Sequence, residues 1–132
     1  MVLLMKELSQ FQGKKYLNLE TYKKDGEAVR TPVWFVLDDT CLYVHTGAES
    51  WKVKRLRHDP KCMLVPCSMS GEPQGTWVAS EGEILTEEEQ IHRINESFNK
   101  KYGFQKAVFG LFRRRNQAVP AILKFKVFVK PA

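Results

Sequence analysis

Four polar residues in the stretch HTGAESWKVKRLRHDP have the types and spacing of an anion-binding site. They are Thr46, Ser50, Lys52 and Arg55. Ser50 can cap a helix over 51–58, and Lys52 and Arg55, three positions apart, then share one helix face. The N-terminal end of a helix is already partly positive, so a lysine in the first turn is locally unfavourable. The pattern predicts a bound phosphate, and a solvated basic helix face is the alternative.

A second candidate site precedes it in RTPVWF, which begins at Arg30. Pro32 has no N–H to give to a sheet, so a strand that contains it should have an open edge or a bulge. A flat heteroaromatic ring can lie along such a strand and take hydrogen bonds from its backbone. The alternative is that Val33 and Phe35 belong to the core and that Trp34 is a surface or interface aromatic.

A third basic cluster, Arg113–Asn116, is a nucleic-acid patch, a site for a polyanionic tail or a solvated helix end, and the helix dipole favours the last of these. The sequence has no Rossmann, Walker or nucleophile-elbow motif. Glu81 and Glu83 share a strand face, but Gly82 between them indicates a bend. With no acid–base pair in view, no catalytic side chain is assigned, and the chemistry is expected to belong to a bound cofactor.

Composition limits the choice of class. The 132 residues predict one domain, 1–132, and a net charge of +6 with a pI near 9.3 indicates an anionic partner. The three cysteines and three histidines are scattered, so no metal site is expected. We expect no signal peptide or membrane span and predict a cytoplasmic protein.

The periodicity predicts mainly antiparallel strands. Alternating or apolar runs indicate six strands, at about 15–22, 28–37, 41–45, 61–67, 76–85 and 118–129. Asp25-Gly26 is typical of a hairpin turn between the first two strands. The predicted fold is mainly β (α+β), a six-stranded antiparallel barrel with peripheral helices.

Helical signals are fewer. Short helices are expected over 1–11, 51–58 and 104–114. The longest helix should begin at a capping box formed by Thr86–Glu89 and end near Gly103. Its apolar stripe consists of Ile91, Ile94, Phe98 and Tyr102.

The order of TPVWF, then TGAESWKVKRLRHDP, LVPC and GTWVASEGEIL resembles the pyridoxamine 5'-phosphate oxidase-like split-barrel flavoproteins. It looks most similar to their small, deazaflavin (coenzyme F-420)-dependent branch. The resemblance implies a six-stranded split barrel and a homodimer with two cofactor sites at the interface. It places the cofactor phosphate on Thr46, Ser50, Lys52 and Arg55. It places the cofactor ring along Arg30, Thr31, Pro32, Val33 and Phe35, with Trp77 reaching it from the partner subunit.

The leading hypothesis is a homodimeric oxidoreductase that binds FMN, or alternatively coenzyme F-420, and acts on a small-molecule substrate. The first alternative is a non-catalytic flavin- or haem-binding protein on the same barrel, with His45 or His58 as the haem ligand. The second is a small nucleic-acid-binding barrel, which would need exposed aromatic residues among cations on a strand face. The cations cluster instead at predicted helix ends, so neither a nucleic-acid nor a membrane partner is expected.

Overall fold

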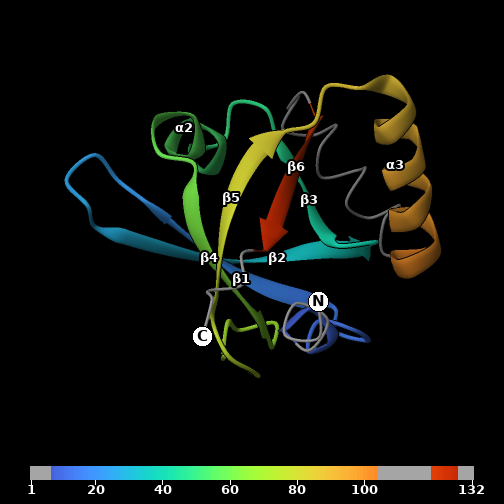
Figure 1. The fold of residues 1–132 in the computed structure, drawn as a ribbon, viewed down its shortest axis with the longest axis horizontal. Coiled ribbons are helices and arrows are strands. Elements are labelled where there is room, and N and C mark those ends of the chain that lie inside the picture. Colours follow the sequence, from blue (N-terminus) through green and yellow to red (C-terminus); the bar gives the residue numbers. More distant parts are fainter. Residues whose placement is uncertain (1–6, 104–119, 128–132) are drawn as a thin grey trace.

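Six antiparallel strands form a closed barrel with helices outside it (Figure 1). The computed structural model describes residues 7–103 and 120–127. The strands neighbour one another in the order β1-β2-β3-β6-β5-β4, and β4 pairs with β1 to close the barrel. In chain order the elements are β1 (Tyr16–Tyr22), β2 (Ala28–Asp38), β3 (Cys41–Gly47), α2 (Trp51–His58), β4 (Lys61–Cys67), β5 (Val78–Ile84), α3 (Glu88–Tyr102) and β6 (Pro120–Val127). The predicted mainly β barrel with peripheral helices is confirmed.

The predicted capping box at Thr86 is wrong. Helix α3 begins at Glu88, and its N-cap is Glu87, which makes no side-chain hydrogen bond to the helix amides. Just before it, Leu85 donates its backbone N–H to the carbonyl oxygen of Ile122 at 2.8 Å. The chain therefore stays bonded to the sheet up to position 85, and Thr86 lies in the connection to the helix. The predicted helix over 104–114, and the greater part of the one over 1–11, lie outside the described residues.

The barrel interior holds the larger hydrophobic core. Alternate residues of each strand point inward, as strand geometry requires. On β6 the inward-facing residues are Leu123, Phe125 and Val127, and Phe125 is fully buried. Gly82 on β5 faces Phe125 so closely that a Cβ atom there would lie 2.7 Å from the ring. This glycine therefore lets the aromatic ring fill the barrel.

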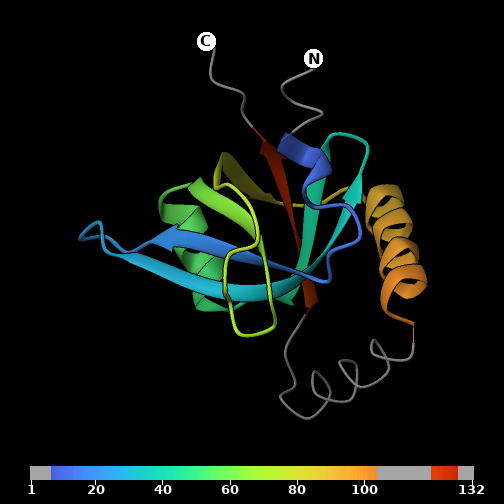
Figure 2. The same cartoon turned by 90° about the horizontal axis from the view of Figure 1, so that it is seen from below.

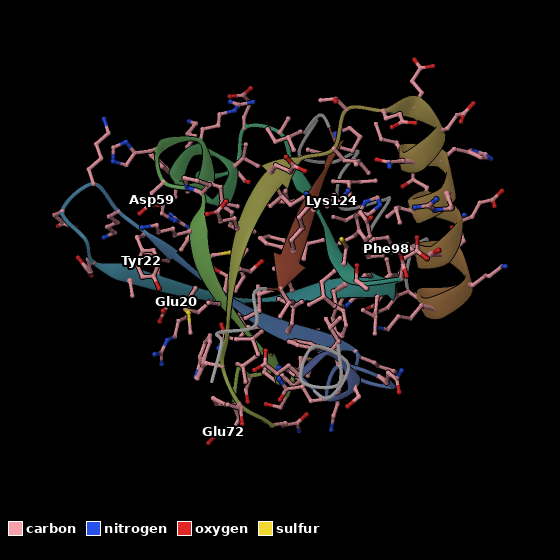
Figure 3. The ribbon with its side chains drawn as sticks, in the orientation of Figure 1. Glu20, Tyr22, Asp59, Glu72, Phe98 and Lys124 are labelled. Atoms are coloured by element: carbon pink, nitrogen blue, oxygen red, sulfur yellow. The ribbon has the colours of Figure 1, made fainter. Side chains whose placement is uncertain are left out.

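A second core lies between α3 and the outer face of the sheet. It contains the predicted apolar stripe of the helix, and Phe98 projects from α3 toward the barrel (Figure 3). Tyr102 at the end of the helix stacks on Trp34, with ring centroids 4.6 Å apart. Its hydroxyl accepts the Phe35 N–H at 2.9 Å and lies 2.7 Å from two acceptors, the carbonyl oxygens of Phe35 and Lys15. These contacts fix α3 against β2.

The β1–β2 hairpin extends beyond the barrel, and α2 lies beside it in both views (Figures 1 and 2). The hairpin turn is the predicted one: Lys23 donates its N–H to Glu27 at 2.9 Å, and Gly26 has a φ of 90°. Strand β2 pairs with β1 from Ala28 to Trp34, whereas its pairing with β3 begins only at Phe35. Among the described strands, the first half of β2 therefore has one open edge, as the proline in it predicts.

Candidate functional site

The start of α2 carries the predicted capping arrangement. Ser50 has extended backbone angles, and its hydroxyl accepts the Val53 N–H at 3.4 Å. Strand β3 runs two residues further than predicted because Thr46 and Gly47 pair with β6. This extension holds Thr46 against the helix start, where its Oγ1 donates to Ser50 Oγ at 3.1 Å. Two of the predicted phosphate ligands are thus in direct contact.

The two predicted cations follow on the same helix. Lys52 is half-buried, and burial together with the charge of Arg55 lowers the pKa of its ammonium group. Burial also lowers the pKa of Arg55. Within residues 7–103 and 120–127, neither cation forms an ion pair with a carboxylate. Partial burial and mutual repulsion destabilise the charged forms of Lys52 and Arg55, and a bound anion would offset both effects.

Arg55 connects this cluster to the hairpin. Its Nε donates to the Thr21 hydroxyl on β1 at 2.6 Å. Thr21 pairs across the sheet with Val29, two residues before Thr31 on the same face of β2. The hydrogen bond therefore links the helix start to the strand that carries the second predicted site.

The second predicted site divides between the two faces of β2. Thr31 and Val33 are partly buried on the inward face, while Pro32 is exposed on the outer one. Phe35 is fully buried in the barrel core, and Lys101 donates its ammonium N–H to the Phe35 carbonyl at 2.9 Å. The core alternative is therefore confirmed for Phe35 and for Val33, which packs against the barrel core. It is wrong for Trp34, which packs against the second core. The open edge of β2 covers only the residues before Phe35. Contact between these residues and a cofactor stays a prediction.

Arg30 and Trp77 are in contact with each other. The Arg30 guanidinium is 4.7 Å from the Trp77 ring centroid, and its Nε donates to Glu20 at 2.9 Å. Glu20 also accepts the Tyr22 hydroxyl proton at 2.7 Å, and these two side chains lie close together on the hairpin in Figure 3. The Glu20 carboxylate and the Trp77 ring therefore both contact Arg30 within this chain. A cofactor contact by Trp77 from a partner subunit remains a prediction.

The donor set at the start of α2 fits a phosphate group. Two hydroxyls, an ammonium and a guanidinium can each donate to phosphate oxygens, and the helix N-terminus adds partial positive charge. Within the described ranges, no group of His, Cys, Asp and Glu side chains could hold a metal ion. In the same part of the chain, no helix is long and apolar enough to cross a lipid bilayer.

Residues 4–128 match the sequence model of a protein family that is described as pyridoxamine 5'-phosphate oxidase. The chain belongs to this family. No curated protein sequence matches the chain. The match confirms the resemblance read from TPVWF and TGAESWKVKRLR, and it covers the barrel, α2 and α3.

Solved structures of the same fold share little sequence with this chain. A putative pyridoxamine 5'-phosphate oxidase from Listeria innocua is 17% identical, with a TM-score of 0.69 over 96% of this chain and 94% of its own. The heme storage protein HutZ from Vibrio cholerae is 14% identical, with a TM-score of 0.66 over 98% and 92%. A FAD-binding protein from Mesorhizobium loti is 14% identical, with a TM-score of 0.66 over 95% and 89%.

Sequence reasoning missed the partners of the predicted residues. The Thr21 hydroxyl accepts a hydrogen bond from Arg55 and the Glu20 carboxylate accepts one from Arg30, and the sequence pattern predicts neither contact. Both residues lie on β1. Thr21 is far from Arg55 along the chain, and Glu20 lies across the β1–β2 hairpin from Arg30. One feature of the sequence does point to such a contact. Thr21 is a polar residue on the same strand face as the apolar Leu19, and a polar side chain in that position needs a hydrogen-bond partner.

Proposed function

We propose that this protein is a flavin-dependent oxidoreductase that binds FMN, with coenzyme F-420 as the alternative, at a homodimer interface. The observation that carries the proposal is the pair of partly buried cations, Lys52 and Arg55, beside the hydroxyls of Thr46 and Ser50. Membership of the pyridoxamine 5'-phosphate oxidase family supports a flavin as the source of the phosphate. When bound, the flavin supplies hydride or electron transfer.

The residues of this chain then bind and orient the cofactor. The α2 start holds the phosphate, and the open edge of β2 around Thr31–Val33 offers backbone groups to the ring. Arg55 couples the two because its hydrogen bond to Thr21 fixes the helix against the hairpin. A small-molecule substrate takes or gives the hydride, and no side chain is required as a general base.

Lys52→Ala tests the phosphate contact. We expect FMN affinity to fall by about 1.5–3 kcal/mol, roughly 10- to 150-fold, because a charge-assisted hydrogen bond is lost. Riboflavin, which lacks the phosphate, should bind the variant and the wild type equally. Arg57→Ala removes an exposed cation from the same helix and serves as the matched control. Equal FMN affinity in the wild type and Lys52→Ala would remove the basis of the proposal.

The nature of the cofactor is read from the purified protein. An absorption spectrum, with mass identification of any extracted cofactor, separates a flavin from a deazaflavin. Steady-state reduction or oxidation of the bound cofactor by candidate substrates then tests catalysis. A protein that binds neither compound at micromolar concentration contradicts the proposal.

Haem binding is the second candidate because the similar structures include a protein described as a heme storage protein. The histidines argue against a ready-made ligand. The Nε2 atom of His45 is buried, and its ring packs edge-on against Phe98 with centroids 4.3 Å apart. His58 is exposed at the end of α2. A Soret band that disappears in His58→Ala but survives in His45→Ala would favour this alternative.

A further inference from the structure

A basic aromatic pocket lies between α2 and the β1–β2 hairpin. Its cavity volume is about 470 Å³. The pocket is lined by two aromatic side chains and four cationic ones, which are Tyr22, Trp51, Lys23, Lys24, Lys54 and Arg55. Figures 1 and 2 both place α2 beside the projecting hairpin, so the two elements form opposite walls. Apart from Arg55, these residues take no part in the predicted phosphate and ring contacts.

Trp51 is the most informative residue of the pocket. It is the first residue of α2 and is 71% exposed, although Val53 and Leu56 supply the buried face of the same helix. An exposed indole contributes little to folding, and tryptophan is enriched where proteins bind ligands. The ammonium of Lys54 lies over one face of the ring, 4.7 Å from its centroid, which leaves the other face for a planar ligand.

The charge of the pocket has one sign. None of the residues that line it in the described part of the chain is acidic, and His58 completes the lining at the end of α2. Lys23 pairs with Glu27 at 3.5 Å, but both side chains are exposed, so this ion pair contributes little. Arg55 is held by its hydrogen bond to Thr21, which fixes a guanidinium at the wall. Such a site attracts anions.

The size of the pocket distinguishes between classes of anion. A volume of about 470 Å³ falls within the range of small-molecule sites, roughly 300–1,000 Å³. An extended single-stranded nucleic acid needs a groove that follows several nucleotides, with an aromatic platform for successive bases. Among the described residues, Trp51 offers the single exposed indole, so there is no platform for successive bases.

We propose that this pocket binds a small aromatic anion, with its planar ring stacked on Trp51 and its acidic group between Lys54 and Arg55. The class consists of aromatic sulfonates, carboxylates and phosphates other than the flavin cofactor. The pocket shares Arg55 with the proposed phosphate site. Trp51 and Lys54 belong to the pocket alone and Lys52 to the phosphate site alone, so variants at these three positions test the two sites separately.

The experiment uses two fluorescent probes that differ in charge. Anilinonaphthalene sulfonate is negatively charged, and N-phenylnaphthylamine has the same aromatic rings without the sulfonate group. We expect the sulfonate to bind the protein in a one-to-one complex and at least fivefold more tightly than the neutral probe. Trp51→Ala should weaken binding of the sulfonate by about 5- to 150-fold, the range of aromatic stacking, and Lys54→Gln should weaken it by about threefold or more.

Three controls decide the interpretation. Arg57→Gln changes an exposed cation on the same helix that does not line the pocket, and should leave probe binding unchanged. Lys52→Ala should also leave it unchanged. Because Trp51 and Lys54 are exposed, their variants should keep the wild-type unfolding temperature.

Each of the following results would overturn the proposal. The first is equal binding of the two probes, and the second is an equal loss in Arg57→Gln and Lys54→Gln. The third is displacement of the sulfonate by FMN, which would assign the pocket to the cofactor. The fourth is displacement by a single-stranded oligonucleotide, which would make the surface a nucleic-acid site.

Discussion

Ser50→Asp separates the structural role of Ser50 from its proposed role in binding. Serine and aspartate are almost equivalent as N-caps, so the helix should keep its first turn. The observed cap bond to Val53 is long, 3.4 Å, so its removal in Ser50→Ala should cost only about 0.5–1 kcal/mol. For Ser50→Asp we expect the free energy of unfolding to stay within about 0.5 kcal/mol of the wild type, because the carboxylate also suits the helix dipole.

The effect of Ser50→Asp on binding should be much larger. At about 5 Å and an effective dielectric constant of 20, a carboxylate and a phosphate repel by about 3 kcal/mol per unit charge, and solvent reduces this value. The new carboxylate also pairs with Lys52, whose charge the phosphate would use. FMN affinity should therefore fall by about 1.5–3 kcal/mol, or roughly 10- to 150-fold, while riboflavin affinity changes little.

Two measurements on the same samples check this reasoning. Chemical denaturation gives the free energy of unfolding, and quenching of flavin fluorescence gives the affinities for FMN and riboflavin. Wild-type FMN affinity in Ser50→Asp would show that the phosphate does not lie at the start of α2. A parallel loss of stability, FMN binding and riboflavin binding would show that Ser50 acts only through the fold.

Three further predictions concern the elements around the site. Tyr102→Phe should lower the free energy of unfolding by about 1–3 kcal/mol, measured by denaturation, because the Phe35 N–H loses its acceptor. Burial lowers the pKa of Lys101 to about 8, so wild-type stability should rise relative to Lys101→Met between about pH 8 and pH 10.4, where only the unfolded chain keeps the proton. If the difference in stability between the wild type and Lys101→Met does not change across this pH range, the pKa of Lys101 is not lowered. Gly82→Ala should cost about 1–3 kcal/mol by crowding Phe125, and an unchanged melting temperature would count against it.

Features set by local sequence were predictable. The helix over 51–58 and its cap at Ser50 follow from a capping residue and from Val53 and Leu56, which repeat on one face. The open edge of β2 follows from Pro32, whose missing N–H is a property of one residue. The family resemblance predicts the cofactor phosphate at this same helix start, and that contact stays a prediction.

Features set by contacts distant in sequence were not predictable. Arg30 meets Trp77 only because the chain returns past β1 after β4, and no periodicity encodes that approach. The basic pocket likewise forms only where the hairpin and α2 face each other, so the sequence alone does not distinguish Trp51 from any other residue that follows an N-cap. The failed capping box at Thr86 has the same origin, because the bond of Leu85 to Ile122 delays the helix.

The position of β6 in the barrel has a consequence for synthesis on the ribosome. The last described strand inserts between β3 and β5, which come much earlier in the chain. Until β6 emerges, both of these strands present unpaired backbone edges, which can join other chains. A nascent or truncated chain that ends before Pro120 is therefore an open sheet prone to self-association. Ribosome-bound chains of increasing length should gain protease resistance only once β6 has cleared the exit tunnel.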